Sequence, residues 1–291
     1  MVFSPDNQTF NTLNLDGSVS LWDAASKQET VTHAGLGTNN TSLAISNDGN
    51  LLAVGAATGS IKVWNRVTQR ELTNFIGHAT QVEYLQFRSN SRILVSAASD
   101  RTVKLWDVKT WRVQTVCRID HRFGQFEASM DGRLAAVTEA DKVNLWNLAT
   151  GKQEASLAGD WDWVDGVAFS PDGRLLAAAS QNGSTVLFEA GSWREVARLR
   201  GVLLGFKSVT FAPDGRRLAT GSSPKEAIKL WDLATRQEVL TLEVEGTESL
   251  WFTAFSPDGN TLVGSHGQGM AQLWCAPPLA EIDAKVATRP Q

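Results

Sequence analysis

The sequence of 291 residues predicts an all-β protein, a seven-bladed β-propeller in which four-stranded antiparallel blades close into one ring. Three observations lead to this fold class. A turn motif recurs seven times, and an aromatic motif recurs seven times in register with it. Outside residues 279–287, no helical periodicity longer than one turn competes with the short alternating runs expected of strands.

The two motifs define the repeat. The first is clearest at residues 168–174, Ala-Phe-Ser-Pro-Asp-Gly-Arg, and its relatives start at positions 3, 45, 87, 128, 169, 211 and 255 when counted from the aromatic or aliphatic residue. The second is Leu-Trp-Asp at residues 105–107. Its aromatic position, the ladder position, holds Trp22, Trp64, Trp106, Trp146, Phe188, Trp231 and Trp274. Because both motifs recur together seven times, we expect seven structural units with buried ladder aromatics.

Each unit is expected to form four strands, as the third unit illustrates. Val82–Phe87 alternates, Ile93–Ser96 is apolar, and Thr102–Trp106 and Arg112–Cys117 alternate again. Gly, Asn, Asp, Ser and Pro fill the gaps, so the strands are joined by tight turns and are antiparallel. Small residues in the second strand, such as those of Leu175–Ser180, allow neighbouring sheets to approach closely.

The repeat covers the chain as a single domain without a linker. The expected blades span residues 1–33, 41–76, 82–117, 123–158, 163–199, 206–242 and 250–286. Met1-Val2-Phe3 lies within the first strand, and only Leu279–Val286 is available in this sequence as the outer strand of the last blade. We therefore expect a frayed junction between the first and seventh blades and suspect that the chain is a piece of a longer one.

Composition excludes several classes of protein. Hydrophobic residues make up 42% and charged residues 20%, which is typical of a folded domain. The 27 basic and 31 acidic residues give a net charge of −4, which disfavours nucleic acid as a partner. Two cysteines, Cys117 and Cys275, are too few for a disulfide framework or a four-cysteine zinc site. No apolar run is long enough to span a bilayer, and no secretory signal is visible.

The motifs resemble those of a known family. Leu105-Trp106-Asp107, the repeat length near 42 and the pair Gly77-His78 are similar to the WD-repeat β-propellers, over essentially the whole chain. The turn at residues 170–174 and the segment 273–282 are similar to bacterial members, whose propellers are often joined to Ser/Thr kinases. The resemblance implies a seven-bladed propeller that binds proteins or peptides.

The resemblance also implies a hydrogen-bonded tetrad of side chains in the third unit. The four family positions are matched by His78, Ser96, Asp100 and Trp106. An imidazole can join a carboxylate to a hydroxyl, while an indole only donates, so the set is expected to be structural. The fifth unit departs from the pattern, because Asp160 occupies the histidine position.

The sequence contains no recognisable catalytic motif. Its four histidines lie in different repeats without metal-binding spacing, and it has no Gly-x-Ser-x-Gly elbow and no phosphate-binding loop. The Asp-Gly turns recur as structural elements do. We expect no catalytic residue, no metal and no cofactor, and a propeller hydrolase or lyase is the least favoured alternative.

Family members bind peptides mostly around the channel mouth, on the face that carries the links between a fourth strand and the next first strand. The resemblance assigns to this rim Thr41, Glu83, Gly124, Asp165, Lys207 and Trp251. Any channel has a rim, so some of these residues are expected to meet only water. Trp251 stands out, because the repeat gives a large aromatic residue there no role in the core.

The segment Gly159–Asp165, between the fourth and fifth units, is unusual. It contains Asp160, Trp161, Asp162 and Trp163. If it were extended, alternation would place the two indoles on one side and the two carboxylates on the other. One interpretation is that Trp163 packs between blades and the aspartates are solvated. The other is that Trp161, Trp163 and the aspartates bind a basic or amphipathic peptide by cation–π and charge-assisted contacts.

The sequence thus predicts a non-enzymatic, monomeric interaction scaffold that binds a protein or peptide, is not inserted in a membrane, and resides in the cytoplasm. The alternative is a regulatory or sensor module of a larger bacterial Ser/Thr kinase, which would lie outside the cytoplasm if the kinase spans the membrane.

Overall fold

A computed structural model describes most of the chain. The described residues are 1–14, 16–32, 39–88, 90–119, 124–201, 208–221, 228–243, 250–266 and 271–276. They contain 27 strands and no helix. Accordingly, no helix in these ranges could cross a membrane.

The first four blades consist of sixteen strands. Blade 1 comprises β1 (Val2–Phe3), β2 (Thr9–Leu13), β3 (Val19–Asp23) and β4 (Glu29–Thr32). Blade 2 comprises β5 (Asn40–Ile45), β6 (Leu51–Ala56), β7 (Ser60–Asn65) and β8 (Arg70–Ile76). Blade 3 comprises β9 (Val82–Arg88), β10 (Ile93–Ala98), β11 (Thr102–Asp107) and β12 (Val113–Arg118). Blade 4 comprises β13 (Phe126–Ala128), β14 (Leu134–Glu139), β15 (Lys142–Asn147) and β16 (Lys152–Ala158).

The last three blades follow the same order. Blade 5 comprises β17 (Val164–Phe169), β18 (Leu175–Ser180), β19 (Ser184–Glu189) and β20 (Glu195–Arg200). Blade 6 comprises β21 (Ser208–Phe211), β22 (Arg217–Gly221), β23 (Ile228–Asp232) and β24 (Gln237–Leu242). Blade 7 comprises β25 (Leu250–Phe255), β26 (Thr261–His266) and β27 (Ala271–Cys275).

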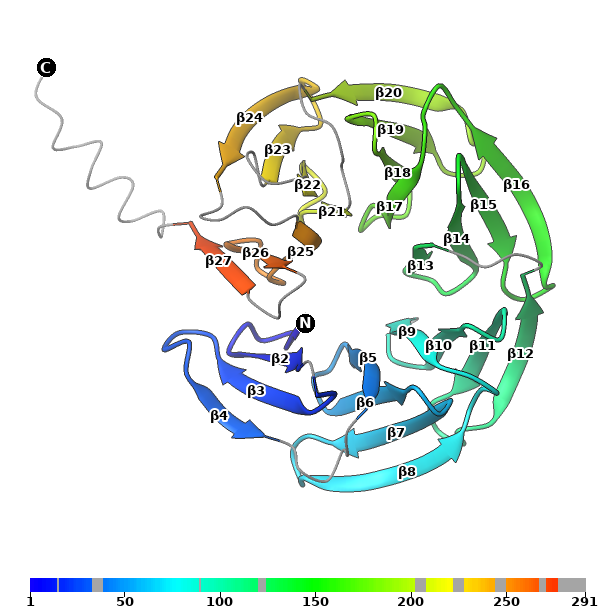
Figure 1. Ribbon diagram of the computed structural model, residues 1–291, viewed down its shortest axis with the longest axis vertical. Helices are drawn as coiled ribbons and strands as arrows, with labels where there is room; N and C mark the ends of the chain where they lie inside the picture. Colours follow the sequence, from blue (N-terminus) through cyan, green and yellow to red (C-terminus); the bar gives the residue numbers. More distant parts are fainter. Residues whose placement is uncertain are drawn as a thin grey trace, which may run out of the picture.

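The blades are arranged around a central channel, with their first strands inside and their fourth strands on the circumference (Figure 1). In every blade the strands pair antiparallel in sequence order. The predicted fold class, a seven-bladed β-propeller of four-stranded antiparallel blades, is therefore confirmed. Three strands are described in blade 7, and Leu279–Val286, expected as its fourth, lies outside the described residues.

The register explains why the two sequence motifs recur together. In blade 3, Leu94 of the second strand lies opposite both Phe87 of the first and Trp106 of the third. The same alignment places Leu176 opposite Phe169 and Phe188 in blade 5. Each motif thus marks one row of residues across a sheet, and turns of fixed length keep the row aligned.

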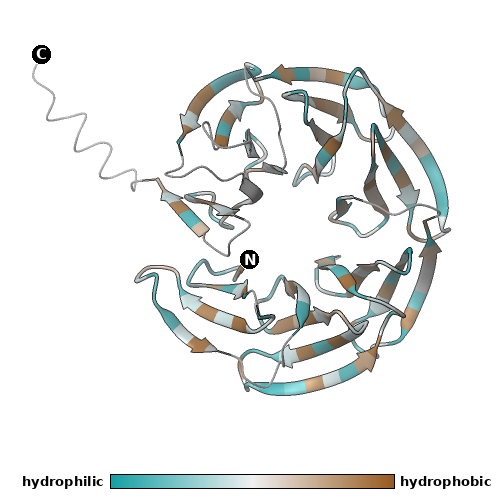
Figure 2. Cartoon of the chain, viewed as in Figure 1, coloured by the Kyte–Doolittle hydropathy of each residue, from teal (hydrophilic) through white to brown (hydrophobic). Residues whose placement is uncertain are grey.

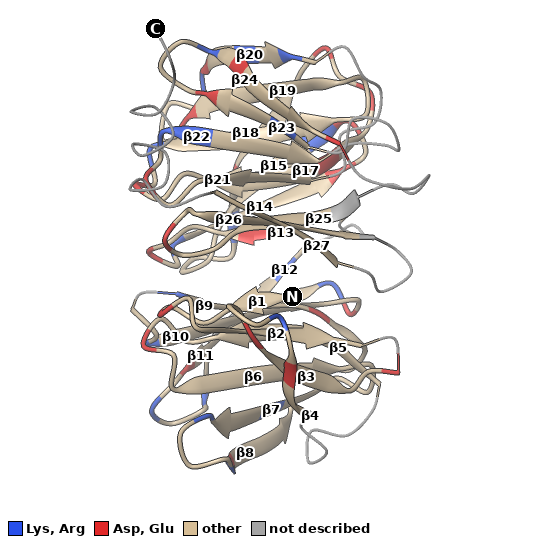
Figure 3. Ribbon diagram, turned by 90° about the vertical axis from the view of Figure 1, so that its left-hand side faces the viewer, with Lys and Arg blue, Asp and Glu red and all other residues tan. Residues whose placement is uncertain are grey.

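The core consists of apolar layers between neighbouring blades. One such layer joins Val95, Val103 and Leu105 of blade 3 to Phe126 and Trp146 of blade 4. The hydropathy colouring shows short hydrophilic and hydrophobic segments in succession along the outer strands, one of whose faces meets solvent (Figure 2). Charged residues lie both along the strands and at the turns on the two faces of the ring (Figure 3). The turns at residues 170–174 and 190–194 define the lower face, and the links at 159–163 and 181–183 define the upper face.

The expectation that all seven ladder aromatics are buried is wrong for three of them. Trp106, Trp146, Phe188 and Trp231 are buried. Trp22, Trp64 and Trp274 are half-buried. Trp22 lies in the layer between blades 7 and 1, Trp64 in the layer between blades 1 and 2, and Trp274 in the layer between blades 6 and 7.

The junction between blades 1 and 7 is looser than the others, as expected, but it is not without packing. Among the described residues, no strand of blade 1 contacts a strand of blade 7 as closely as strands of other neighbouring blades contact each other. Phe3 and Phe10 of blade 1 form one apolar cluster with Val263 of blade 7. On the lower face, the backbone N–H of Asp258 donates to Oδ1 of Asn7 at 3.1 Å. Side-chain packing and this hydrogen bond therefore join the ends of the ring, without a strand shared between the two sheets in the described residues.

Candidate functional site

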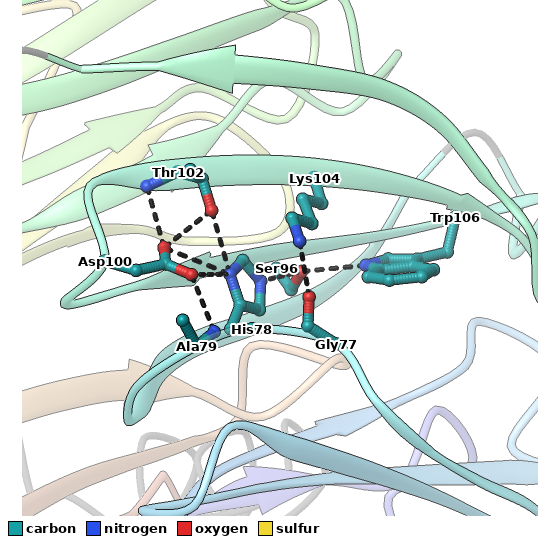
Figure 4. A network of polar contacts seen from close by, with 8 residues as sticks. All are labelled: Gly77, His78, Ala79, Ser96, Asp100, Thr102, Lys104 and Trp106. Atoms are coloured by element: carbon teal, nitrogen blue, oxygen red, sulfur yellow. Dashed lines mark hydrogen bonds and ion pairs between the residues drawn. The ribbon is translucent and has the colours of Figure 1, made fainter.

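The tetrad residues of blade 3 lie in one continuous hydrogen-bond network (Figure 4). Nδ1 of His78 lies 3.1 Å from the carboxylate of Asp100, and Nε2 lies 2.7 Å from the hydroxyl of Ser96. That hydroxyl also accepts the indole N–H of Trp106 at 2.8 Å. The network joins the link before blade 3 to its second and third strands and to the turn between them.

The protonation of the network follows from these contacts. Burial lowers the pKa of His78 below its ordinary value, although the Asp100 carboxylate opposes this shift. Burial acts to raise the pKa of Asp100, but hydrogen bonds from Thr102 and Ala79 outweigh it and hold the pKa below its usual range. A neutral imidazole that donates from Nδ1 to an ionised carboxylate fits this pattern. Ser96 is fully buried, so its hydroxyl cannot meet a substrate.

Other blades keep only part of this network. The indole N–H of Trp22 donates to the Thr12 hydroxyl at 2.8 Å in blade 1, and that of Trp231 donates to Thr220 at 3.0 Å in blade 6. In blade 4 the hydroxyl position is Val137. The buried Nε1 of Trp146 accordingly has no hydrogen-bond partner among the described residues.

Blade 5 replaces all four positions of the network at once. Asp160, Ala178, Asn182 and Phe188 stand where blade 3 has His78, Ser96, Asp100 and Trp106. Asn182 keeps one function of the lost turn residue, because its Oδ1 accepts hydrogen bonds from Ser184.

Trp161 fills the space that these replacements leave. It is 6% exposed and lies in the cluster between blades 4 and 5, edge-on to Phe188. Its indole N–H donates to the carbonyl of Asp141. The prediction of Trp161 as a partner-binding surface residue is therefore wrong, because a phenyl ring and an alanine methyl leave room that an indole occupies.

Trp163 has the opposite environment, with 54% of its surface exposed. The proposed alternation is also wrong, because residues 159–163 form a link rather than a strand and its two indoles point to different environments. The alternative in which Trp163 packs between blades is wrong as well, since Trp161 does so. The Trp163 carbonyl accepts the N–H of Gln181 at 2.8 Å, which fixes the backbone of the link on the upper face.

The aspartates of the link are exposed, as either interpretation required. The carbonyl of Asp160 accepts Nδ2 of Asn182 at 3.1 Å and Nη1 of Arg198 at 3.3 Å. Trp163 thus presents an indole to solvent on a link that also carries two exposed carboxylates, Asp160 and Asp162.

The expected rim residues share a backbone feature that the sequence did not reveal. In four blades the first strand is irregular at this position, so that one residue is left without a partner in the second strand. The unpaired residues are Thr41, Glu83, Asp165 and Trp251. A β-bulge of this kind turns a side chain away from the regular alternation of a strand.

The structure orients three of these rim side chains. Asp165 accepts a hydrogen bond from Nε2 of Gln181 at 2.7 Å, and Glu83 accepts one from the hydroxyl of Ser99. Ser99 and Gln181 occupy equivalent positions, so the two carboxylates are held in the same way. Thr41 instead donates to the carbonyl of Val82 at 2.6 Å, in the next blade. Gly124, at the rim of blade 4, is exposed, while Lys207 and the side chain of Trp251 lie outside the described residues.

The channel below the rim has features that the sequence analysis missed. Cavities of about 470 and 600 Å³ lie along it, and Phe252 and Tyr84 line both. The Tyr84 hydroxyl donates to the Gly124 carbonyl at 2.8 Å. Arg88 and Glu127 form an ion pair at 2.7 Å between blades 3 and 4. Phe252 directly follows the bulged Trp251. Because the bulge breaks the regular alternation of the strand, the sequence alone could not show that Phe252 lines the channel.

Metal chemistry finds no support among the described residues, where no group of three or more His, Cys, Asp or Glu side chains could hold an ion. Of the two cysteines, Cys117 is buried, and burial raises the pKa of its thiol to about 11. Cys275 is exposed and free.

Comparison with known proteins supplies the last evidence. The family model described as "WD domain, G-beta repeat" matches residues 30–65, 69–107, 151–189 and 197–232, together more than half of the chain. The small ribosomal subunit protein RACK1y of Oryza sativa subsp. japonica is 28% identical over 138 residues, 45% of this chain and 40% of that protein. RACK1z of the same plant is 26% identical over 133 residues, 44% of this chain and 39% of that protein.

A shorter match is the apoptotic protease-activating factor 1 of Danio rerio, which is 39% identical over 56 residues, 19% of this chain and 4% of that protein. The chain spans about 40% of the length of the rice relatives that it matches.

Proposed function

The chain belongs to the WD40 repeat family, and from this membership we propose that it is a non-enzymatic scaffold that binds a protein or peptide on the upper face, at the channel mouth. WD40 propellers are typically protein-interaction scaffolds. One fold supports many functions, so the evidence for this function must come from the residues of the site.

The observation that carries the proposal is the set of bulges at the rim. One backbone position is bulged in four blades, and it carries four different side chains, those of Thr41, Glu83, Asp165 and Trp251. Residues that maintain the repeat are similar from blade to blade. A position with a common geometry and a different chemistry in each blade is suited to recognition, because it presents a varied surface on a rigid frame.

The charge of this surface favours a basic or amphipathic peptide. Glu83 and Asp165 present carboxylates held by Ser99 and Gln181. Asp162, next to the exposed Trp163, adds a third carboxylate three residues before the rim residue Asp165. A Lys or Arg side chain would gain charge-assisted hydrogen bonds from the carboxylates and a cation–π contact from the indole.

We place the protein in the cytoplasm as a monomer. The alternative is a regulatory module of a larger bacterial Ser/Thr kinase, which rests on the similarity of residues 170–174 and 273–282 to bacterial members.

The test is selection of short random peptides on the immobilised chain, followed by fluorescence anisotropy of the enriched sequences. We expect enrichment of Lys and Arg, and about tenfold weaker binding to the double variant Glu83→Gln, Asp165→Asn. The matched control is Asp214→Asn, because Asp214 is an exposed carboxylate of a lower-face turn whose backbone contact an amide can keep. Enriched peptides that are acidic, or that bind the double variant as tightly as the original chain, would contradict the proposal.

A further inference from the structure

One position of the repeat carries a cationic residue in blade 2 and an apolar residue in each of the other six blades. It is the second residue after the ladder aromatic, and in blade 2 it is Arg66. The other blades have Ala24, Val108, Leu148, Ala190, Leu233 and Ala276 at this position. The backbone is the same throughout. The N–H of Arg66 donates to the Asn50 carbonyl at 2.7 Å, just as that of Leu148 donates to Arg133 at 2.8 Å.

The repeat itself therefore does not require a charge at this position. Leu148 is fully buried in the layer between blades 3 and 4, and an apolar side chain suffices there. Blade 2 instead places a half-buried guanidinium at the seam between blades 1 and 2, where burial lowers its pKa and the nearby Asp6 carboxylate opposes that shift. Putting a charge at such a seam costs free energy unless something pairs with it.

The contacts of Arg66 leave much of its hydrogen-bonding capacity unused. Nη1 donates to the Gly49 carbonyl at 2.8 Å, and Nη2 donates to the Thr9 hydroxyl of blade 1 at 2.8 Å. A guanidinium has five N–H donors, so three find no acceptor among the described residues. No carboxylate in those ranges lies within 4.0 Å of it.

A cavity of about 540 Å³ opens beside Arg66 on the lower face, and two carboxylates line it, those of Asp6 in blade 1 and Asp48 in blade 2. Hydrogen bonds from Ser4 and Ser46 lower the pKa of Asp6 and Asp48 respectively, so both are ionised at neutral pH. The same bonds, at 2.6 and 2.5 Å, hold the carboxylates on their own turns.

Opposite charges thus line a common cavity without pairing directly. A simple anion would be attracted by Arg66 but repelled by the two carboxylates. A simple cation would be attracted by the carboxylates but repelled by the guanidinium. A ligand that carries both charges close together satisfies the two groups. The cavity is also lined by Pro5, Leu21 and Val67, the last of which is strongly exposed, so an apolar group can be covered as well.

We propose that the seam between blades 1 and 2 binds a small zwitterion, a free α-amino acid with an apolar side chain. The ligand carboxylate accepts hydrogen bonds from Arg66, and the ammonium group lies against Asp6 or Asp48. The side chain packs on Leu21 and Val67. The cavity volume is in the usual range for small-molecule sites. This site is on the face opposite the peptide-binding surface and is independent of it.

The alternative role for Arg66 is a clamp that joins blades 1 and 2 through Thr9. The variant Arg66→Leu separates the two roles, because leucine occupies this position in blades 4 and 6 and suits the backbone. Arg66→Gln is the second variant, which keeps donors and removes the charge. The matched control is Arg174→Leu, since the Arg174 side chain is 85% exposed on the same face.

The experiment is titration calorimetry with L-leucine, L-valine and L-phenylalanine, together with two analogues of leucine. 4-Methylpentanoate lacks the ammonium group, and 3-methylbutylamine lacks the carboxylate. We expect at least one amino acid to bind the original chain and the Arg174→Leu variant equally. For Arg66→Leu, for Arg66→Gln and for both analogues we expect at least about tenfold weaker binding, as lost charge-assisted contacts require.

Three results would overturn the proposal. The first is the absence of any heat of binding with all three amino acids, at concentrations about 100 times the KM values usual for small metabolites, which lie in the micromolar-to-millimolar range. The second is equal binding to Arg66→Leu, and the third is binding of 4-methylpentanoate as tight as that of leucine. If Arg66→Leu lowers the melting temperature and no amino acid binds, Arg66 is a clamp.

Discussion

The indole of Trp161 lies edge-on against the ring of Phe188, with ring centroids 5.7 Å apart and planes inclined by 70°. The pair replaces a buried polar network with an apolar contact. Blade 5 lacks the histidine, the serine and the ladder tryptophan of blade 3, so it has no imidazole to satisfy and no indole N–H at the ladder position. Its stability therefore depends on packing, and Trp161 supplies the missing volume.

The variant Trp161→Ala should lower the free energy of unfolding by about 3–5 kcal/mol, because it opens a cavity between blades 4 and 5 and removes an aromatic contact. Urea denaturation measures this change. Trp163→Ala, two residues further on, removes an exposed ring and should change stability by less than about 0.5 kcal/mol. Equal effects of the two variants would show that the link is not packed as described.

Trp163→Ala should instead weaken the binding of the peptides selected on the upper face, because the cation–π contact contributes about 0.5–2 kcal/mol to the free energy of binding. Anisotropy titrations at increasing salt concentration measure the loss of affinity and its dependence on charge. The affinity of the original chain should fall as the salt concentration rises. A matched control is Ile76→Ala, since Ile76 is an exposed apolar residue on the circumference. If both variants bind alike, Trp163 is not part of the surface.

The variant Val137→Thr should stabilise the protein by about 0.5–1.5 kcal/mol, because it gives the buried Nε1 of Trp146 an acceptor. Thr220 already serves Trp231 in this way. The matched control is Val95→Thr, which buries a hydroxyl at a second-strand position where no ladder indole N–H donates to it, and which should destabilise the protein. Thermal melts that rank both variants below the original chain would refute the expected hydrogen bond.

The stability of the network around His78 should depend on pH. Its pKa is lowered in the folded state, so the unfolded chain binds the proton more readily. The resulting stabilisation is fully present above the ordinary pKa of 6.5 and is lost as the pH falls below that value. The urea midpoint should fall between about pH 7.5 and about pH 5.5, and this fall should be smaller for His78→Ala than for the original chain.

The same variant should lower stability by about 1–3 kcal/mol at neutral pH, because it leaves the Ser96 hydroxyl and the Asp100 carboxylate without the imidazole. A pH dependence identical to that of the original chain would mean that other histidines account for the whole effect.

The sequence was sufficient for the fold because each repeat has its own turns and its own ladder aromatic, so a misjudged element in one unit is corrected by six others. The environment of Trp161 could not be predicted, since alternation applies only to extended backbone. The rim depended on bulges, which follow from pairing between strands rather than from a local pattern. Arg66 was visible as a departure from the repeat, but its cavity depends on Asp6 of the neighbouring blade.

The hydrogen bond between Asn7 and Asp258 joins residues 251 positions apart, whereas every strand pairing among the described residues lies within a single repeat. Loop-closure entropy grows only slowly with length, so closing the ring costs about 1–2 kcal/mol more than closing one repeat. The search for such a distant contact is nevertheless slow. Blades should form first as local hairpins, and the seam between blades 1 and 7 should be the last to assemble and the first to open when the protein unfolds.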